Sequence, residues 1–233
     1  DGKFNITTEF GGWLQEYIPD EELLDLIHYV YEINLKYGAT EVITDPCTQK
    51  VKEIERKAMS VGLKLLHSKV RHLGTEENIK ILTKIYFDLK DKIDISFSTS
   101  VKDIIVENNT IKGIITQDTK QIAGEYVLLA VGREGSKWLT ELFDKHNVPM
   151  TQNQVDVGVR VECPNMIMEE INENLYEGKF IFKTSTGSTV RTFCSNPGGH
   201  VVMENYEGVV NVNGHSFSDP ALSSNNTNFA LLV

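Results

Sequence analysis

The sequence has few cysteines and no long hydrophobic run. Three cysteines, Cys47, Cys163 and Cys194, lie far apart among its 233 residues. This number and spacing are typical neither of a disulfide framework nor of a zinc motif, so we expect a reducing, cytoplasmic compartment. No apolar run approaches the roughly 18 residues that a membrane-spanning helix needs. We therefore expect no membrane partner.

Basic residues are fewer than acidic residues. Lysine and arginine number 23 against 33 aspartates and glutamates, which gives a formal net charge of −10 at pH 7. Binding to nucleic-acid phosphates requires clustered lysine and arginine side chains, so this balance argues against a nucleic-acid partner. The six histidines show no His-x-x-x-His spacing, and we expect no metal site. The remaining composition, 40% hydrophobic and 24% charged, is that of an ordinary globular protein.

Helical periodicity dominates the first third of the sequence. Apolar residues recur every three or four positions after Pro19, after Pro46 and after Thr75, and each series predicts one amphipathic helix. Asp20, Asp45 and Thr75 are the expected amino-terminal caps of these helices. A fourth helix is expected over 136–146.

The periodicity changes to two from residue 93 onward, which is typical of strands. Residues 93–101 predict a half-buried strand. Asn108-Asn109 predicts a tight hairpin turn between strands at 103–106 and 110–115, because asparagine tolerates a positive φ. Residues 127–131 are five consecutive apolar residues, and they predict a strand buried on both faces, as in a parallel sheet covered by helices.

From residue 155 onward, short apolar segments separated by glycine, asparagine and proline predict a β-rich region. The expected strands are 155–161, 179–184, 190–195, 200–205, 209–212 and 229–233, with a polar loop at 218–228. A terminal apolar run, and a parallel-type strand with few possible neighbours, favour a chain cut from a longer protein.

Six short motifs give the sequence a wider resemblance. They are 71–75 (RHLGT), 132–136 (GREGS), 156–160 (DVGVR), 191–199 (RTFCSNPGG), 212–216 (VNGHS) and 226–230 (NTNFA). Their order and spacing resemble those of the bacterial family of uncharacterised FAD-dependent dehydrogenases over nearly the whole chain. Residues 93–135 also resemble the second part of the FAD-binding domain of glutathione-reductase-type flavoproteins. In those proteins a strand ending in an Ala-Thr-Gly-like tripeptide approaches the dinucleotide, and here the tripeptide is Ala130-Val131-Gly132.

The resemblance implies an α+β fold. An α/β remnant of a glutathione-reductase-type FAD/NAD(P)-binding domain would be joined to a β-rich substrate domain. We expect a mostly helical segment over 1–74, a partial FAD-binding domain with its β-meander over 75–147, and a β-rich substrate-domain segment over 148–233. The family's Gly-x-Gly-x-x-Gly loop, whose glycines let the backbone close on a pyrophosphate, and its carboxy-terminal flavin segment are not in this sequence. We therefore expect a fragment that by itself neither retains FAD stoichiometrically nor is active.

The resemblance also suggests site residues. Those expected toward FAD are Val101, Ala130, Gly132 and Arg133. Those expected to be catalytic are His72, Asn196 and His215, and those expected to bind substrate are Arg71, Gly198 and Gly199. Each also has a plainer interpretation: a core valine, a turn glycine, an exposed loop arginine, a hairpin turn or a structural histidine.

The implied function is FAD-dependent oxidation or reduction of an unidentified small molecule. A non-catalytic module that binds a small molecule or a protein is the alternative from a different class. An oxygen-using hydroxylase of the same fold group is a second alternative. The sequence leaves the substrate, the electron partner and the oligomeric state open.

Overall fold

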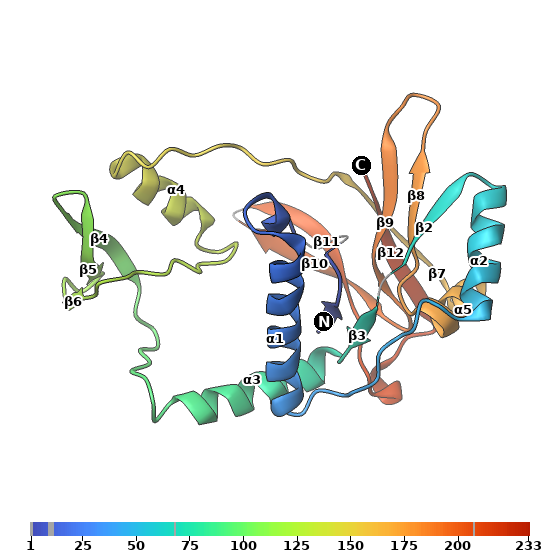
Figure 1. Ribbon diagram of the computed structural model, residues 1–233, viewed down its shortest axis with the longest axis horizontal. Helices are drawn as coiled ribbons and strands as arrows, with labels where there is room; N and C mark the ends of the chain where they lie inside the picture. Colours follow the sequence, from blue (N-terminus) through green and yellow to red (C-terminus); the bar gives the residue numbers. More distant parts are fainter. Residues whose placement is uncertain (1, 9–11, 68, 207) are drawn as a thin grey trace. The chain divides into compact units, whose positions relative to one another are not determined.

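A computed structural model describes residues 2–8, 12–67, 69–206 and 208–233 (Figure 1). The chain divides into two compact units. Unit 1 combines the residues up to Leu89 with Asp156–Asn205 and Val210–Val233, and unit 2 combines Lys90–Val155 with Tyr206–Val209. Both units contain helices and strands, so the expected α+β class is confirmed. The division into three segments stays a prediction.

The helices of unit 1, apart from one that the sequence did not predict, begin close to the predicted positions but with different caps. They are α1 (Asp20–Lys36), α2 (Gln49–Ser60), α3 (Thr75–Leu89) and α5 (Asn165–Leu175). Thr48, not Asp45, caps α2, because its hydroxyl accepts a hydrogen bond from the Val51 amide at 3.2 Å. Asp20 and Thr75 are the first helical residues of α1 and α3 rather than their caps. The sequence did not predict α5.

A five-stranded sheet forms the centre of unit 1. Its strand order is β2-β8-β9-β12-β7, and every neighbouring pair is antiparallel. The strands are β2 (Leu63–Leu66), β7 (Gly158–Pro164), β8 (Lys179–Lys183), β9 (Thr189–Asn196) and β12 (Asn226–Leu232). β7, β8, β9 and β12 each overlap a predicted strand, although β12 begins inside the expected polar loop.

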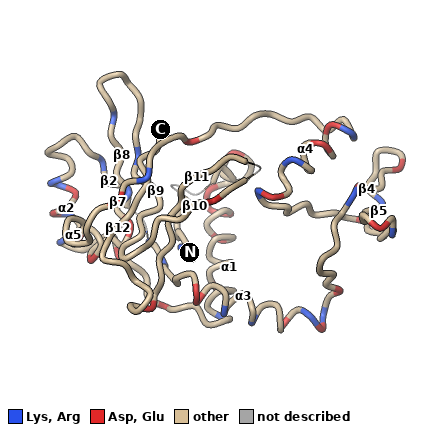
Figure 2. Tube along the Cα trace, turned by 180° about the vertical axis from the view of Figure 1, so that it is seen from behind, with Lys and Arg blue, Asp and Glu red and all other residues tan. Residues whose placement is uncertain are grey.

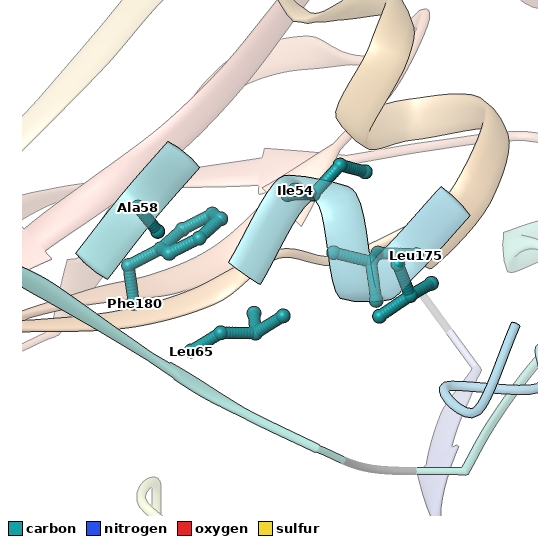
Figure 3. Close-up of a cluster of buried hydrophobic side chains, with 6 residues drawn as sticks. Ile54, Ala58, Leu65, Leu175 and Phe180 are labelled. Atoms are coloured by element: carbon teal, nitrogen blue, oxygen red, sulfur yellow. The ribbon is translucent and has the colours of Figure 1, made fainter. Parts of the chain in front are cut away.

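Helices α2 and α5 cover one face of this sheet, and a hydrophobic core lies between them and the strands (Figure 1). Figure 3 shows the cluster, which comprises Val51, Ile54 and Ala58 of α2, Leu65 of β2, Leu175 of α5 and Phe180 of β8. All six are at most 8% exposed. Complete burial of a large apolar side chain stabilises the fold by about 1.5–3 kcal/mol, so this cluster fixes the helices on the sheet.

Unit 1 also contains a second core, one smaller sheet and most of another. β1 (Lys3–Asn5) pairs antiparallel with β3 (Val70–His72), and β10 (His200–Tyr206) is the neighbour of β11 (Val209–His215). Ala39, Leu73 and Ile81 form a buried cluster beside α1 and α3. Short 3-10 helices lie at Leu14–Glu16 and Pro220–Leu222.

Unit 2 consists of a β-meander and one helix. β4 (Val101–Glu107), β5 (Thr110–Thr116) and β6 (Gln121–Ala123) pair antiparallel, and α4 spans Ser136–Lys145. The predicted Asn-Asn turn is confirmed, because Asn108 and Asn109 have φ values of 52° and 58°. The carboxylate of Asp103 in β4 holds the end of α4, with an oxygen 2.8 Å from Nε2 of His146.

Two predicted strands of unit 2 are wrong. Residues 93–100 lie outside any strand, and Phe97 is 68% exposed. Residues 127–131, expected as a doubly buried parallel strand, also belong to no sheet, and Leu128 is 92% exposed. An apolar run becomes a strand only beside another strand that completes its backbone hydrogen bonds, and the described residues of unit 2 place none there.

Candidate functional site

A cluster of polar side chains lies on the face of the five-stranded sheet opposite α2 and α5. This polar cluster consists of His72, Arg160, Tyr176, Asn196, Ser216 and Asn228. Asn196, Ser216 and Asn228 have no exposed surface. Burying a polar group costs free energy unless the group is hydrogen-bonded. A set of buried polar side chains as dense as this one is therefore the best candidate site among the described residues.

Strand pairing places three members of the polar cluster. Asn196 of β9 is the register partner of Asn228 of β12, while Arg160 of β7 is the partner of Ala230. Side chains two residues apart on a strand share a face, so these three point the same way. Asn196 Nδ2 donates to Asn228 Oδ1 at 3.3 Å, and Arg160 Nη1 donates to the same oxygen at 2.6 Å.

A β-bulge turns Asn196 toward the polar cluster. Three steps along β9, from Phe193 to Asn196, match two steps along β12, from Ala230 to Asn228. Cys194, inside the bulge, has a φ of 49°. The extra residue reverses the alternation, so Asn196 shares the face of Phe193, whereas Ser195 points to the other side. Without the bulge, Asn196 would face α2 and α5.

The hydroxyl of Ser216 joins the remaining members of the polar cluster. Its Oγ lies 3.0 Å from His72 Nε2 and 3.0 Å from the Tyr176 hydroxyl, and it donates to Asn196 Oδ1 at 3.4 Å. The rings of His72 and Tyr176 stack with their centroids 4.3 Å apart. A hydroxyl has one proton and two acceptor positions, so Ser216 links three partners by donating to one and accepting from the others.

Burial sets the protonation of the two rings. Burial first, and the positive charge of Lys3 second, lower the pKa of His72 to about 4. Lys3 is the register partner of His72 in the β1–β3 pair, and its ammonium lies 3.7 Å from the Glu177 carboxylate. Burial also raises the pKa of Tyr176. At neutral pH the site therefore holds a neutral imidazole beside a protonated phenol.

Glycines allow the backbone to approach the polar cluster closely. A Cβ at Gly214 would lie 2.2 Å from Asn228 Oδ1, 2.3 Å from Asn196 Nδ2 and 2.5 Å from Arg160 Nη1. The predicted turn at Gly198 and Gly199 is confirmed, because it joins β9 to β10 and Gly198 has a φ of 59°. These two glycines serve a turn beside Asn196, which is the plainer of their two interpretations.

The structure separates Arg71 from His72. Adjacent residues of a strand point to opposite sides, and the Arg71 guanidinium lies 3.9 Å from the centre of the Tyr31 ring of α1. Arg71 is 1% exposed, and its Nε and Nη2 have no hydrogen-bond partner in the part of the chain that the structure describes. A buried guanidinium with free donors suits an anionic group, so a substrate-binding role for Arg71 stays a prediction.

His215 ends β11 immediately before Ser216 and is half-buried. No contact among the described residues connects its imidazole to the polar cluster. Its catalytic role therefore remains a sequence-based prediction, in contrast to His72 and Asn196, which Ser216 joins.

The four residues expected toward FAD all belong to unit 2. Val101 begins β4 and is half-buried, whereas Ala130, Gly132 and Arg133 are exposed. Arg133 lies over the ring of Tyr206 at 4.8 Å. A Cβ at Gly132 would meet no atom within 4 Å, so this glycine makes room for no neighbouring group among the described residues. These residues alone do not form a cradle that fits FAD, and their roles toward FAD stay predictions.

Four members of the polar cluster were not assigned a role from the sequence. Arg160, Ser216 and Asn228 lie inside the quoted motifs, and Tyr176 follows α5. A sequence signal was available only for Arg160, which is a charged residue between two valines of a predicted strand, a pattern typical of a buried polar contact. Asn228 lay in the expected polar loop, where a polar residue is ordinary.

The Ser216–His72 distance is that of a nucleophile and its base, but Ser216 is fully buried. The polar cluster is therefore better suited to orienting groups and holding a proton than to attacking a substrate.

Neither a protein-family model nor a curated protein matches this chain. Within the described residues, no three His, Cys, Asp or Glu side chains are grouped to hold a metal ion. In the same part of the chain, every helix is too short or too polar to cross a membrane.

Proposed function

We propose that this chain is part of an FAD-dependent oxidoreductase that acts on a small molecule, and that it includes part of a glutathione-reductase-type fold. One observation carries the proposal: five of the six motifs behind the family resemblance each contribute one residue to the polar cluster. These residues are His72 from 71–75, Arg160 from 156–160, Asn196 from 191–199, Ser216 from 212–216 and Asn228 from 226–230. Segments so distant in sequence gain a common explanation if they serve one site.

In this proposal the polar cluster belongs to the substrate side of the enzyme. FAD, when bound, supplies the electron transfer, and the protein orients the reactants. The neutral His72 imidazole and the Ser216 hydroxyl are hydrogen-bonded at 3.0 Å. Arg160 and Asn196 hold this pair in place through Asn228 and the carbonyl of Cys194. Binding of FAD is expected to need the glycine loop that this sequence lacks.

The test is to express the complete gene product and to record its absorption spectrum. We expect the visible bands of an oxidised flavin, which are lost on reduction with dithionite. A screen of reducible and oxidisable small molecules then identifies the substrate. A full-length protein that is colourless and free of flavin would contradict the proposal.

The role of the polar cluster is tested in the same protein by His72→Asn. We expect kcat to fall by about 10²–10⁴-fold with flavin content unchanged, which is the usual range for loss of a proton-transfer group. His28→Asn, a change at an exposed histidine of α1, is the matched control and should leave kcat unchanged. Equal activity of the two variants would show that His72 takes no part in the reaction.

The second candidate is a non-catalytic module that binds a small molecule or a protein. Residues 127–131 favour it, because they form no strand and Leu128 and Ala130 are exposed, where the flavoprotein hypothesis expects a strand buried on both faces. A full-length protein that binds small molecules without any flavin would support this alternative.

A further inference from the structure

A cavity of about 550 Å³ lies between the five-stranded sheet and the helices α2 and α5. This cavity is on the opposite side of the sheet from the polar cluster. An inference drawn from it therefore does not depend on the proposed function. Its lining is largely apolar and includes Ile54, Val61, Ile171, Phe180, Phe229 and Leu231. Cavities of about 300–1,000 Å³ with such linings are typical of small-molecule sites.

Ser195 is a polar residue without a side-chain partner in the wall of this cavity. The bulge in β9 turns it to the cavity side, and it is 3% exposed. Its Oγ has no hydrogen-bond partner among the described residues. The other hydroxyl of β9 in the wall, that of Thr192, accepts from the Phe180 amide at 2.8 Å and donates to the Gly178 carbonyl at 2.7 Å. Ser195 is therefore a buried donor that a bound molecule would satisfy.

The charged side chains around the cavity are paired with one another. Lys57 Nζ lies 2.7 Å from the Glu170 carboxylate, and Lys50 lies 3.0 Å from it. Arg191 forms an ion pair with Asp156. Figure 2 shows the wider pattern, with acidic and basic residues interspersed along α2. Because these partners already neutralise each other, the cavity suits an uncharged molecule better than an anion.

We propose that this cavity binds a small, uncharged, mainly hydrophobic molecule whose carbonyl or hydroxyl oxygen accepts a hydrogen bond from Ser195. The apolar wall supplies the affinity, and the single free donor fixes the orientation of the ligand.

Two neutral fluorescent probes test this proposal on the whole chain. Prodan has a carbonyl oxygen, whereas N-phenyl-1-naphthylamine has an apolar body without one. We expect both probes to bind with blue-shifted emission. Ser195→Ala should weaken Prodan binding about fivefold, the usual effect of one hydrogen bond, and should leave N-phenyl-1-naphthylamine binding unchanged.

A matched pair of variants shows whether the probes occupy this cavity. Val61 lines it and is 66% exposed, whereas Val42 is 75% exposed and lies elsewhere. Val61→Trp should weaken both probes at least tenfold, and Val42→Trp should weaken neither. Because both changes are at exposed positions, neither should unfold the chain, and circular dichroism verifies this.

Four results would overturn the proposal. The first is the absence of blue-shifted emission from both probes. The second is binding that Val61→Trp leaves unchanged, which would place the probes elsewhere on the protein. The third is Prodan affinity that does not change in Ser195→Ala. The fourth is tighter binding of the anionic probe 1-anilinonaphthalene-8-sulfonate at the same cavity, which would contradict the uncharged class of ligand.

Discussion

The hydroxyl of Ser216 lies 3.0 Å from Nε2 of His72, although 144 positions separate the two residues. A second connection runs beside it, because the amide and hydroxyl of Thr75 donate to the Ser216 carbonyl at 3.3 and 3.2 Å. The segment after β11 is thus fixed to the beginning of α3 at both its side chain and its backbone. The polar cluster depends on this attachment.

The half-buried imidazole of His72 should make the fold sensitive to acid. Its pKa is lowered from 6.5 to about 4, so the unfolded chain takes up this proton at a higher pH than the folded chain does. The titration of His72 therefore leaves the free energy of unfolding unchanged above about pH 6.5 and lowers it as the pH drops toward about 4. The shift corresponds to about 3 kcal/mol, and we expect about 2 kcal/mol after solvent screening.

Urea unfolding of the wild type, His72→Gln and His28→Gln, repeated between about pH 7 and about pH 4, measures this contribution. The slope of stability against pH should become shallower only in His72→Gln. Equal slopes in all three proteins would mean that His72 is not held neutral by burial.

Glu76 in the first turn of α3 should stabilise the segment after β11. Its Oε1 accepts hydrogen bonds from the amides of Ser218 and Asp219 at 2.7 and 3.0 Å and from the Ser218 hydroxyl. Burial alone would raise the pKa of Glu76, but these hydrogen bonds outweigh it and lower the pKa to about 2. This stabilisation is present above pH 4.5 and is lost as the pH falls toward about 2.

At neutral pH, Glu76→Gln should reduce the free energy of unfolding by about 1 kcal/mol, because a neutral amide accepts these hydrogen bonds less strongly. Glu77→Gln is the control in the same turn, since Glu77 forms an exposed ion pair with Lys80. That change should have an effect of at most a few tenths of a kcal/mol. Equal losses in the two variants would show that the Glu76 contacts contribute nothing specific.

Gly214→Ala should disrupt the polar cluster by sterics alone. The new methyl group would lie 2.2 Å from Asn228 Oδ1 and 2.3 Å from Asn196 Nδ2, and both asparagines are fully buried. We expect a loss of about 1–3 kcal/mol in the free energy of unfolding, as for other overpacked sites. Gly12→Ala is the control, because a Cβ there meets no atom within 4 Å. Chemical denaturation of both variants measures the difference.

The hairpin of unit 2 should tolerate glycine at Asn109, where φ is 58°. Asn109→Gly is expected to stabilise the chain by about 0.5 kcal/mol, because Asn-Gly is the preferred pair for this turn. Asn109→Val should instead cost about 1–2 kcal/mol, since a β-branched residue is strained at a positive φ. Thermal unfolding of the two variants gives the sign of each effect. A stable Asn109→Val protein would contradict the turn geometry.

Local patterns located most elements but did not always identify the residues they bury: in α3, Ile79 and Leu82 are 61% and 56% exposed, whereas Ile81 is buried. The stripes of α1, α3 and α4, and the alternation of β8, β9 and β10, predicted these elements within a few residues. They failed at 127–131, because a strand requires a partner that no local pattern supplies. They also missed α5, whose Met166 and Ile167 are exposed while Leu175 is buried, so its apolar residues do not form one stripe.

The candidate site was predictable only in part. His72 and Asn196 stood out within their motifs, and both belong to the polar cluster. The role of Ser216 as the connecting hydroxyl depends on contacts between distant segments, which the sequence does not reveal. The bulge at Cys194 was equally unpredictable, because one extra residue in a strand does not change the composition of the segment.

Strand β12 lies between β9 and β7 in the five-stranded sheet, although it follows both of them in the sequence. During synthesis on the ribosome, β7 and β9 therefore emerge before the strand that joins them. Their edges stay unpaired until residues 226–232 have left the exit tunnel. Unpaired strand edges are aggregation-prone, so we expect the nascent chain to be a client of a ribosome-associated holding chaperone until that moment.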